Sequence, residues 1–163
     1  MDPVTSRANI GRPREEVFDY LADIANHAEF SDHFLKDWRL TRVDSVGKGA
    51  GARFRRDKRF DRFGWGDMTF IEVNRPYQIV AVGRGGKFNR NKTYSTWTLI
   101  PSSGGTVVEY TTETEPALPT DRIMEAFGMR RWFRRGADKA MRRLQSILEE
   151  DYGRGKRATV AGL

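Results

Sequence analysis

The chain carries two histidines, His27 and His33, which are its first candidates for acid–base chemistry. An imidazole titrates near neutral pH, and His33 directly follows Asp32, so its ring could act as an acid or base at the mouth of a pocket. A spacing of six residues does not place the two rings on one helical face. Zinc takes three or four protein ligands, and no acidic cluster accompanies the histidines at ligand spacing, so no metal site is expected. The favoured interpretation is a pair of surface or loop histidines.

A basic and aromatic run, GARFRRDKRFDRFGWG at residues 51–66, has the composition of a nucleic-acid surface. Residues of a strand alternate between two faces. The odd positions therefore form an outer face of mixed charge, and exposure to solvent accounts for these charges without a nucleic-acid partner. The even positions combine Phe54 and Phe60 with two cations on the inner face. These cations, Arg56 and Lys58, either reach water at a cavity rim or pair with an acid or with the anionic group of a ligand.

Several kinds of chemistry are excluded by residue type. The chain has no cysteine, which removes disulfides, thiolate metal sites and cysteine nucleophiles and indicates a reducing, cytoplasmic location. No G-x-S-x-G sequence supplies a serine nucleophile, and the glycine-rich stretches VGKGAG and RGGKF lack the G-K-[ST] ending of a phosphate-binding loop. No cofactor is therefore expected. No segment has the roughly 20 apolar residues that cross a bilayer.

The net charge of +7 arises from 29 basic and 22 acidic residues. Such a field attracts nucleic acid, anionic lipid or acidic ligands. The basic excess is spread over residues 51–66, the last predicted helix and the C-terminal tail instead of forming one block. A nucleic-acid partner is therefore allowed but not favoured, and the composition does not define an oligomeric state.

The hydrophobic pattern predicts one α+β domain over residues 1–152. A first strand alternates over 4–10, and two short helices follow, the first of them introduced by Pro13 and the second spanning about 26–34. An antiparallel meander of six more strands is then predicted over 37–45, 52–60, 66–73, 77–84, 93–100 and 106–115.

A long amphipathic helix is predicted over 119–151, because its apolar residues recur at intervals of three and four. Two glycines inside it, Gly128 and Gly136, predict a bend or a need for small side chains. Residues 153–163 have no core-forming pattern and are expected to be a disordered basic tail.

Several short motifs resemble the START/Bet v 1-like superfamily. They are I-x-R-P-x-E-x-V-F-D-Y-L-A-D, N-H-A-E-F, R-P-Y before a strand, W-T-L-I-P and G-G-T-V-V-E-Y, and with the last helix they span residues 4–150 in the superfamily's order. The chain is most similar to the bacterial polyketide cyclase/dehydrase group (SRPBCC). The resemblance implies a helix-grip fold, in which a curved antiparallel sheet wraps around a long C-terminal helix. It also implies a deep pocket between them that binds hydrophobic small molecules.

Aromatic residues are expected to line this implied pocket. Small residues are expected to line it too, at positions where a filled core would need large side chains. The predicted ligand-binding residues are Phe34, Trp38, Phe54, Arg56, Phe70, Ala81, Gly83, Tyr94, Trp97, Phe127, Arg130, Phe133 and Ala137. A catalytic group would be a polar side chain with a perturbed pKa in the pocket, and the candidates are Tyr94, His33 and Arg56.

Three functions are compatible with these patterns. The first is binding of a hydrophobic small molecule, such as a lipid or a polyketide, in the pocket. The second is a metal-free enzyme of the cyclase/dehydrase kind that uses the same pocket. The third is an interaction module that binds RNA, the ribosome or an acidic protein through its basic surface. Binding by the third would be sensitive to salt, whereas binding inside a cavity would be nearly independent of it.

Overall fold

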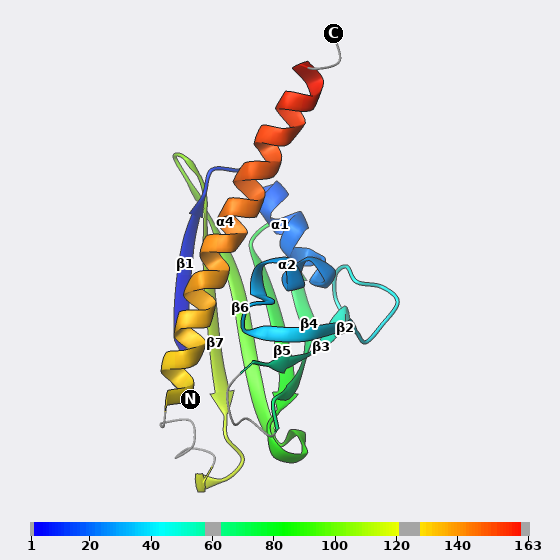
Figure 1. Ribbon diagram of the computed structural model, residues 1–163, viewed down its shortest axis with the longest axis vertical. Helices are drawn as coiled ribbons and strands as arrows, with labels where there is room; N and C mark the ends of the chain where they lie inside the picture. Colours follow the sequence, from blue (N-terminus) through cyan, green and yellow to red (C-terminus); the bar gives the residue numbers. More distant parts are fainter. Residues whose placement is uncertain (1, 58–62, 121–127, 161–163) are drawn as a thin grey trace.

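The computed structural model describes residues 2–57, 63–120 and 128–160, and the side chains of these residues up to position 150. Its strands form one curled antiparallel sheet that wraps around a long helix, as the sequence predicts (Figure 1). The elements are β1 (Val4–Ile10), α1 (Arg14–Ala22), η1 (Ile24–Asn26), α2 (His27–Ser31), β2 (Leu35–Leu40), β3 (Gly51–Arg56), β4 (Trp65–Asn74), β5 (Gln78–Gly85), η2 (Lys87–Asn89), β6 (Asn91–Ser102), β7 (Gly105–Glu115) and α4 (Arg130–Val160). The strand order is β1-β7-β6-β5-β4-β3-β2.

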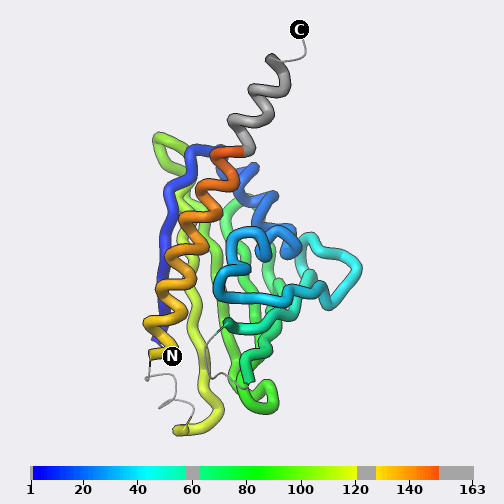
Figure 2. The backbone as a smooth tube through the Cα atoms, in the orientation of Figure 1, coloured from blue at the N-terminus to red at the C-terminus, as the bar shows by residue number. Residues whose placement is uncertain are grey.

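The first strand and the last helix lie side by side along the sheet (Figure 2). Alternate residues of β1 point inward, and one of them, Ser6, donates a hydrogen bond of 2.6 Å to Asp138 of α4. The inward face of α4 repeats at intervals of three and four, as predicted, and its buried hydrophobic residues are Ala137, Ala140, Met141, Leu144 and Leu148. The sheet and α4 therefore share one hydrophobic core. In the described residues no helix is long and apolar enough to cross a bilayer.

Both glycines singled out in the last helix have a structural reason. Gly128 has a φ of +87°, a left-handed value that glycine adopts without strain, and α4 begins two residues later, at Arg130. The helix predicted over 119–151 is thus interrupted at Gly128, and at its other end α4 continues to Val160, past the predicted limit of 151. At Gly136 a Cβ would lie 2.5 Å from Cδ2 of Phe34, so the ring of Phe34 packs directly on the helix backbone.

The predicted strand over 37–45 is wrong in its bounds, because β2 ends at Leu40. The chain beyond β2 forms a loop whose backbone groups form hydrogen bonds with the helical segment. The amide of Ile24 donates to the carbonyl of Ser45 at 2.8 Å, and the amide of Gly47 donates to the carbonyl of Ala22 at 3.0 Å. The backbone groups of this loop have hydrogen-bond partners outside the sheet, and β2 therefore ends at Leu40. In β3 the predicted alternation is confirmed, with Arg53 and Arg55 exposed and the even positions turned inward.

Candidate ligand-binding cavity

A cavity of about 400 Å³ lies between the inner face of the sheet, α2 and α4. Cavities of this size hold small organic molecules. Its walls carry many aromatic and other large apolar side chains: Phe30, Phe34, Leu35, Trp38, Phe54, Phe63, Met68, Trp97, Phe133 and Met141. A ligand inside it would therefore be surrounded largely by apolar surface.

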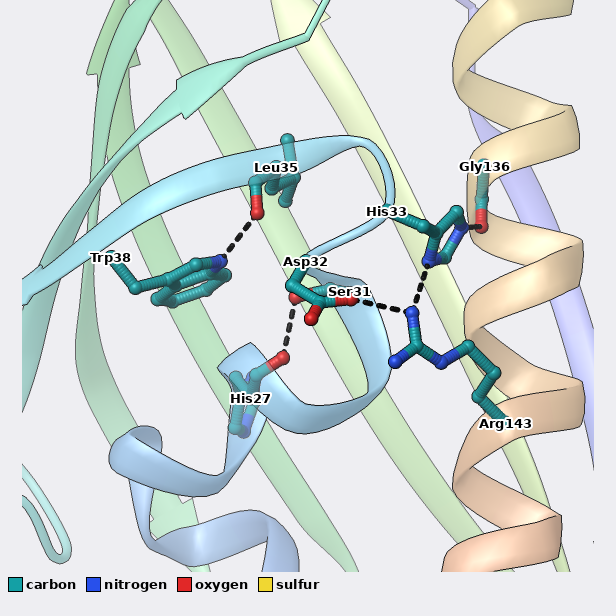
Figure 3. A network of polar contacts seen from close by, with 8 residues as sticks. All are labelled: His27, Ser31, Asp32, His33, Leu35, Trp38, Gly136 and Arg143. Carbon is teal, nitrogen blue, oxygen red and sulfur yellow. Dashed lines mark hydrogen bonds and ion pairs between the residues drawn. The ribbon is translucent and has the colours of Figure 1, made fainter.

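The aromatic rings of the wall pack against one another and so hold its shape. Trp38 and Phe54 face each other with centroids 4.9 Å apart, and Phe34 meets Phe133 of α4 edge to face at 5.7 Å. The indole nitrogen of Trp38 donates to the carbonyl of Leu35 at 2.8 Å, which fixes the ring at the start of β2 (Figure 3). The polar edge of this aromatic wall is thus satisfied within the protein.

His27 lies in the wall of the cavity, and the prediction that it is a surface or loop residue is wrong. The side chain is buried, its Nε2 donates to the carbonyl of Leu21 at 2.8 Å, and its ring lies 5.1 Å from that of Trp97. Burial lowers the pKa of His27 to about 4, although the bond to Leu21 and the charge of Asp23 act in the opposite direction. His27 is therefore neutral at pH 7. Phe30, three residues later on the same helical face, was the sequence signal for its burial.

A group of three hydroxyl side chains interrupts the apolar wall. Ser95 of β6 lies between two residues of β7, with its Oγ 3.3 Å from the phenolic oxygen of Tyr110 and 3.1 Å from the hydroxyl of Thr112. All three residues line the cavity. Burial raises the pKa of Tyr110, so its phenol stays protonated. Sequence reasoning missed these residues, although alternation along β7 places Tyr110 and Thr112 on the inward face with Val108.

Cations gather at the end of the cavity formed by the β5–β6 hairpin. Lys87 and Arg90 line this end together with Arg56 of β3. Arg84 and Asp67 also border it, but the strand register places their side chains on the outer face of the sheet, the face of Tyr94. Asp67 accepts a hydrogen bond of 2.8 Å from the backbone amide of Arg84. The ammonium group of Lys87 lies 5.9 Å from the centroid of the Phe63 ring, and Arg56 Nη2 donates to the Phe63 carbonyl at 3.0 Å. Among the described residues, this end of the cavity therefore has a positive local charge.

The predicted ligand-binding residues divide into two groups in the structure. Those that line the cavity are Phe34, Trp38, Phe54, Arg56, Gly83, Trp97 and Phe133. Those that do not are Phe70, Ala81, Tyr94, Arg130 and Ala137. Phe127, like Lys58 and Phe60, lies outside the described residues.

Strand alternation and helix rotation explain the second group. Thr93 and Ser95 face the cavity, so Tyr94 between them faces the other side of the sheet. Phe70 and Ala81 are cross-strand partners that are wholly buried in the core. Arg130 is exposed at the start of α4, and Ala137 is buried on the same helix without reaching the cavity.

His33 joins the segment after α2 to α4 and does not line the cavity (Figure 3). Its Nε2 donates to the carbonyl of Gly136 at 3.0 Å, and its Nδ1 accepts from Nη1 of Arg143 at 3.2 Å. Arg143 also pairs with Asp32 at 2.5 Å. Desolvation and the nearby charges of Lys139 and Arg143 lower the pKa of His33, against the bond to Gly136 and the charge of Asp32. Both ring nitrogens thus have protein partners.

A curled sheet that grips a helix around a ligand-sized cavity defines a helix-grip protein. The chain belongs to the family described as polyketide cyclase / dehydrase and lipid transport, whose model matches residues 1–149, and this confirms the resemblance seen in the sequence. Among curated proteins no sequence matches the chain.

Three solved structures illustrate the likeness of fold. The KanY protein (ms6282) is 16% identical with a TM-score of 0.73, over 90% of this chain and 97% of that one. TTHA0849 from Thermus thermophilus is 12% identical with a TM-score of 0.70, over 91% and 98%. DynU16, a protein in the dynemicin biosynthetic locus, is 16% identical with a TM-score of 0.59, over 91% of this chain and 48% of that one. At these identities the likeness shows the fold alone.

Proposed function

We propose that the protein binds a hydrophobic small molecule with an anionic end, such as a lipid or a polyketide, between the sheet and α4. The observation that carries this proposal is the cavity of about 400 Å³ with its aromatic walls. A filled core would bury the same side chains against one another, whereas here they surround a space large enough for a ligand. Membership of a family that includes lipid transport supports the same function.

The cations at the β5–β6 hairpin support the proposal that the ligand has an anionic end. Lys87 is exposed to solvent at the edge of the cavity, while Arg56 and Arg90 are half-buried. A carboxylate, sulfonate or phosphate there would meet three positive charges, those of Arg56, Lys87 and Arg90. Since Lys87 is in water, the expected gain in binding free energy from it is modest.

Filling the cavity tests the proposal. Ala140 is buried and lines the cavity, so Ala140→Phe is expected to weaken uptake of the neutral fluorescent probe N-phenyl-1-naphthylamine by about tenfold or more while stability is kept. Ala137, one helical turn earlier, is buried away from the cavity, so Ala137→Phe is expected to cost about 1 to 3 kcal/mol of stability by overpacking. Probe titration and urea unfolding measure the two effects.

The comparison of these two variants can fail in an informative way. If the parent protein takes up no probe, and native mass spectrometry of protein from its own source shows no bound molecule, small-molecule binding is wrong. Uptake that persists unchanged in Ala140→Phe would place the ligand outside the cavity.

The charge of the ligand is tested with a matched probe. Anilinonaphthalene-8-sulfonate has the skeleton of N-phenyl-1-naphthylamine plus one sulfonate. The variant Lys87→Gln is expected to bind the sulfonate probe about twofold more weakly, because one exposed charge contact is removed. Binding of the neutral probe is expected to stay the same. An equal loss for both probes would contradict a charge effect.

A cyclase/dehydrase-type enzyme in the same cavity is the second candidate. The observation that favours it is that His27 and Tyr110 line the cavity with shifted pKa values, as catalytic acids and bases often do. Mass spectrometry of a recovered ligand separates the two functions. A ligand that returns unchanged supports binding alone, and a product that has lost water supports the enzyme.

A further inference from the structure

The hydroxyl groups of Ser95, Tyr110 and Thr112 form a polar site in an otherwise aromatic part of the cavity wall. Ser95 and Thr112 are directly opposite each other across β6 and β7, and Tyr110 is opposite Trp97. The ring of Tyr110 stacks on that of Trp97 with centroids 4.9 Å apart. Cross-strand partners share one face of a sheet, so the three hydroxyls come from adjacent positions of the inner face. Their positions are therefore set by the sheet and by ring packing.

The hydrogen bonds of this site have a fixed direction. Each hydroxyl has one proton to donate, and a carbonyl oxygen can only accept. Thr112 donates to the carbonyl of Tyr94 at 3.1 Å, so its own oxygen must accept from Ser95 at 3.1 Å. The proton of Ser95 is then used, and Tyr110 must be the donor in the contact of 3.3 Å with Ser95.

The consequence concerns what the site can offer to a ligand. With all three protons committed, the phenolic oxygen of Tyr110 retains only lone pairs, and it lies in the cavity wall. Burial raises the pKa of Tyr110, against the hydrogen bonds with Ser95 and Thr112, so the phenol is protonated at neutral pH. The site therefore accepts a hydrogen bond from a ligand and has no proton left to give.

We infer that Tyr110, ordered by Ser95 and Thr112, is a ligand subsite that selects a hydrogen-bond donor, a hydroxyl group on an otherwise apolar chain or ring. The inference rests on the proposed function and adds to it a feature that distinguishes one apolar ligand from another. An ether or a methyl group at the same place would leave the acceptor without a donor and would remove any water that served it.

The subsite and the cationic end are separated along β6. Ser95 is four residues from Asn91, the first residue of β6 and a lining residue at the hairpin. A rise of about 3.3 Å per residue gives a separation of roughly 13 Å. A ligand that reaches both ends would carry its hydroxyl and its anionic group about this far apart.

The test uses three carboxylates of equal chain length as competitors of N-phenyl-1-naphthylamine. They are 10-hydroxydecanoate, 10-methoxydecanoate and decanoate, which end in a donor, an ether acceptor and a methyl group. The parent protein is expected to bind 10-hydroxydecanoate about tenfold more tightly than the methoxy compound. Tyr110→Phe is expected to reduce this ratio to about one, since the acceptor is removed. Tyr94→Phe makes the same change on the opposite face of β6 and is expected to keep the ratio.

A second variant tests the direction of the hydrogen bonds. Thr112→Val removes the acceptor that holds the Ser95 proton, so Ser95 can donate to Tyr110 and the phenol can donate to the ligand. The methoxy compound is then expected to gain affinity relative to the parent. Urea unfolding checks that each variant is folded.

The outcomes separate the subsite from the cavity. Displacement of the probe with no preference for the hydroxyl compound, or with a preference that survives in Tyr110→Phe, overturns the subsite and leaves the proposed function standing. Absence of probe uptake by the parent overturns the proposed function and the subsite together.

Discussion

Lowering the pH from 7 to 5 is expected to destabilise the protein by about 2 kcal/mol through His27, and by about 3 kcal/mol at pH 4. Burial lowers the pKa of His27 from 6.5 to about 4 in the folded chain. The unfolded chain therefore binds a proton at its ordinary pKa, while the folded chain resists it. The stability that the neutral His27 contributes to the folded chain is complete above pH 6.5 and is lost as the pH falls toward 4. Below pH 4 this contribution changes little further.

The measurement is urea unfolding at several pH values for the parent and for His27→Gln. The carboxylates of the chain titrate in both proteins, so their effect cancels in the difference. His33, whose pKa is also lowered, contributes in the same direction and stays present in both proteins. The difference in free energy of unfolding is expected to shrink as the pH falls. A difference that is constant from pH 7 to 4, or an NMR titration of His27 near pH 6.5, would show that the ring is accessible to water.

Gly83→Ala is expected to lower the free energy of unfolding by about 3 kcal/mol or more. A Cβ at this position would overlap the backbone carbonyl oxygen of Asp67, and its distance to the carbonyl carbon of Asp67 would be 3.1 Å. Backbone cannot move aside as the end of a flexible side chain can, so β4 and β5 would have to separate. Gly83 lines the cavity, but its small size is required by the neighbouring strand before any ligand is considered.

Gly104→Ala is the matched control for this prediction. A Cβ at Gly104 would meet nothing within 4 Å, so the change is expected to alter stability by less than about 0.5 kcal/mol. Both effects are read from urea unfolding at pH 7. A variant Gly83→Ala that unfolds like the parent would mean that β4 lies farther from this position than the structure places it.

Much of the fold follows from local patterns in the sequence. Alternation over residues 4–10 and over 52–56 assigns the inner and outer faces of β1 and β3, because a strand turns its side chains by half a turn per residue. The helical period assigns the buried stripe of α4 in the same way. The limits of elements were less predictable. β2 ends early because the backbone of the loop after it finds partners on the helical segment, which no local pattern contains.

The cavity was decided by tertiary structure, because a pattern shows which face is inward and not whether the atoms on that face fill the space. Ala137 and Ala140 belong to one apolar stripe, yet only Ala140 lines the cavity, since the docking of α4 against β1 sets its rotation. The hydroxyl subsite likewise needs the register that brings Ser95 to Thr112 across two strands. Sequence alone therefore determined the sheet, the last helix and the apolar character of the interior. The empty space, the direction of its hydrogen bonds and the neutral state of His27 arise from contacts between residues far apart in the chain.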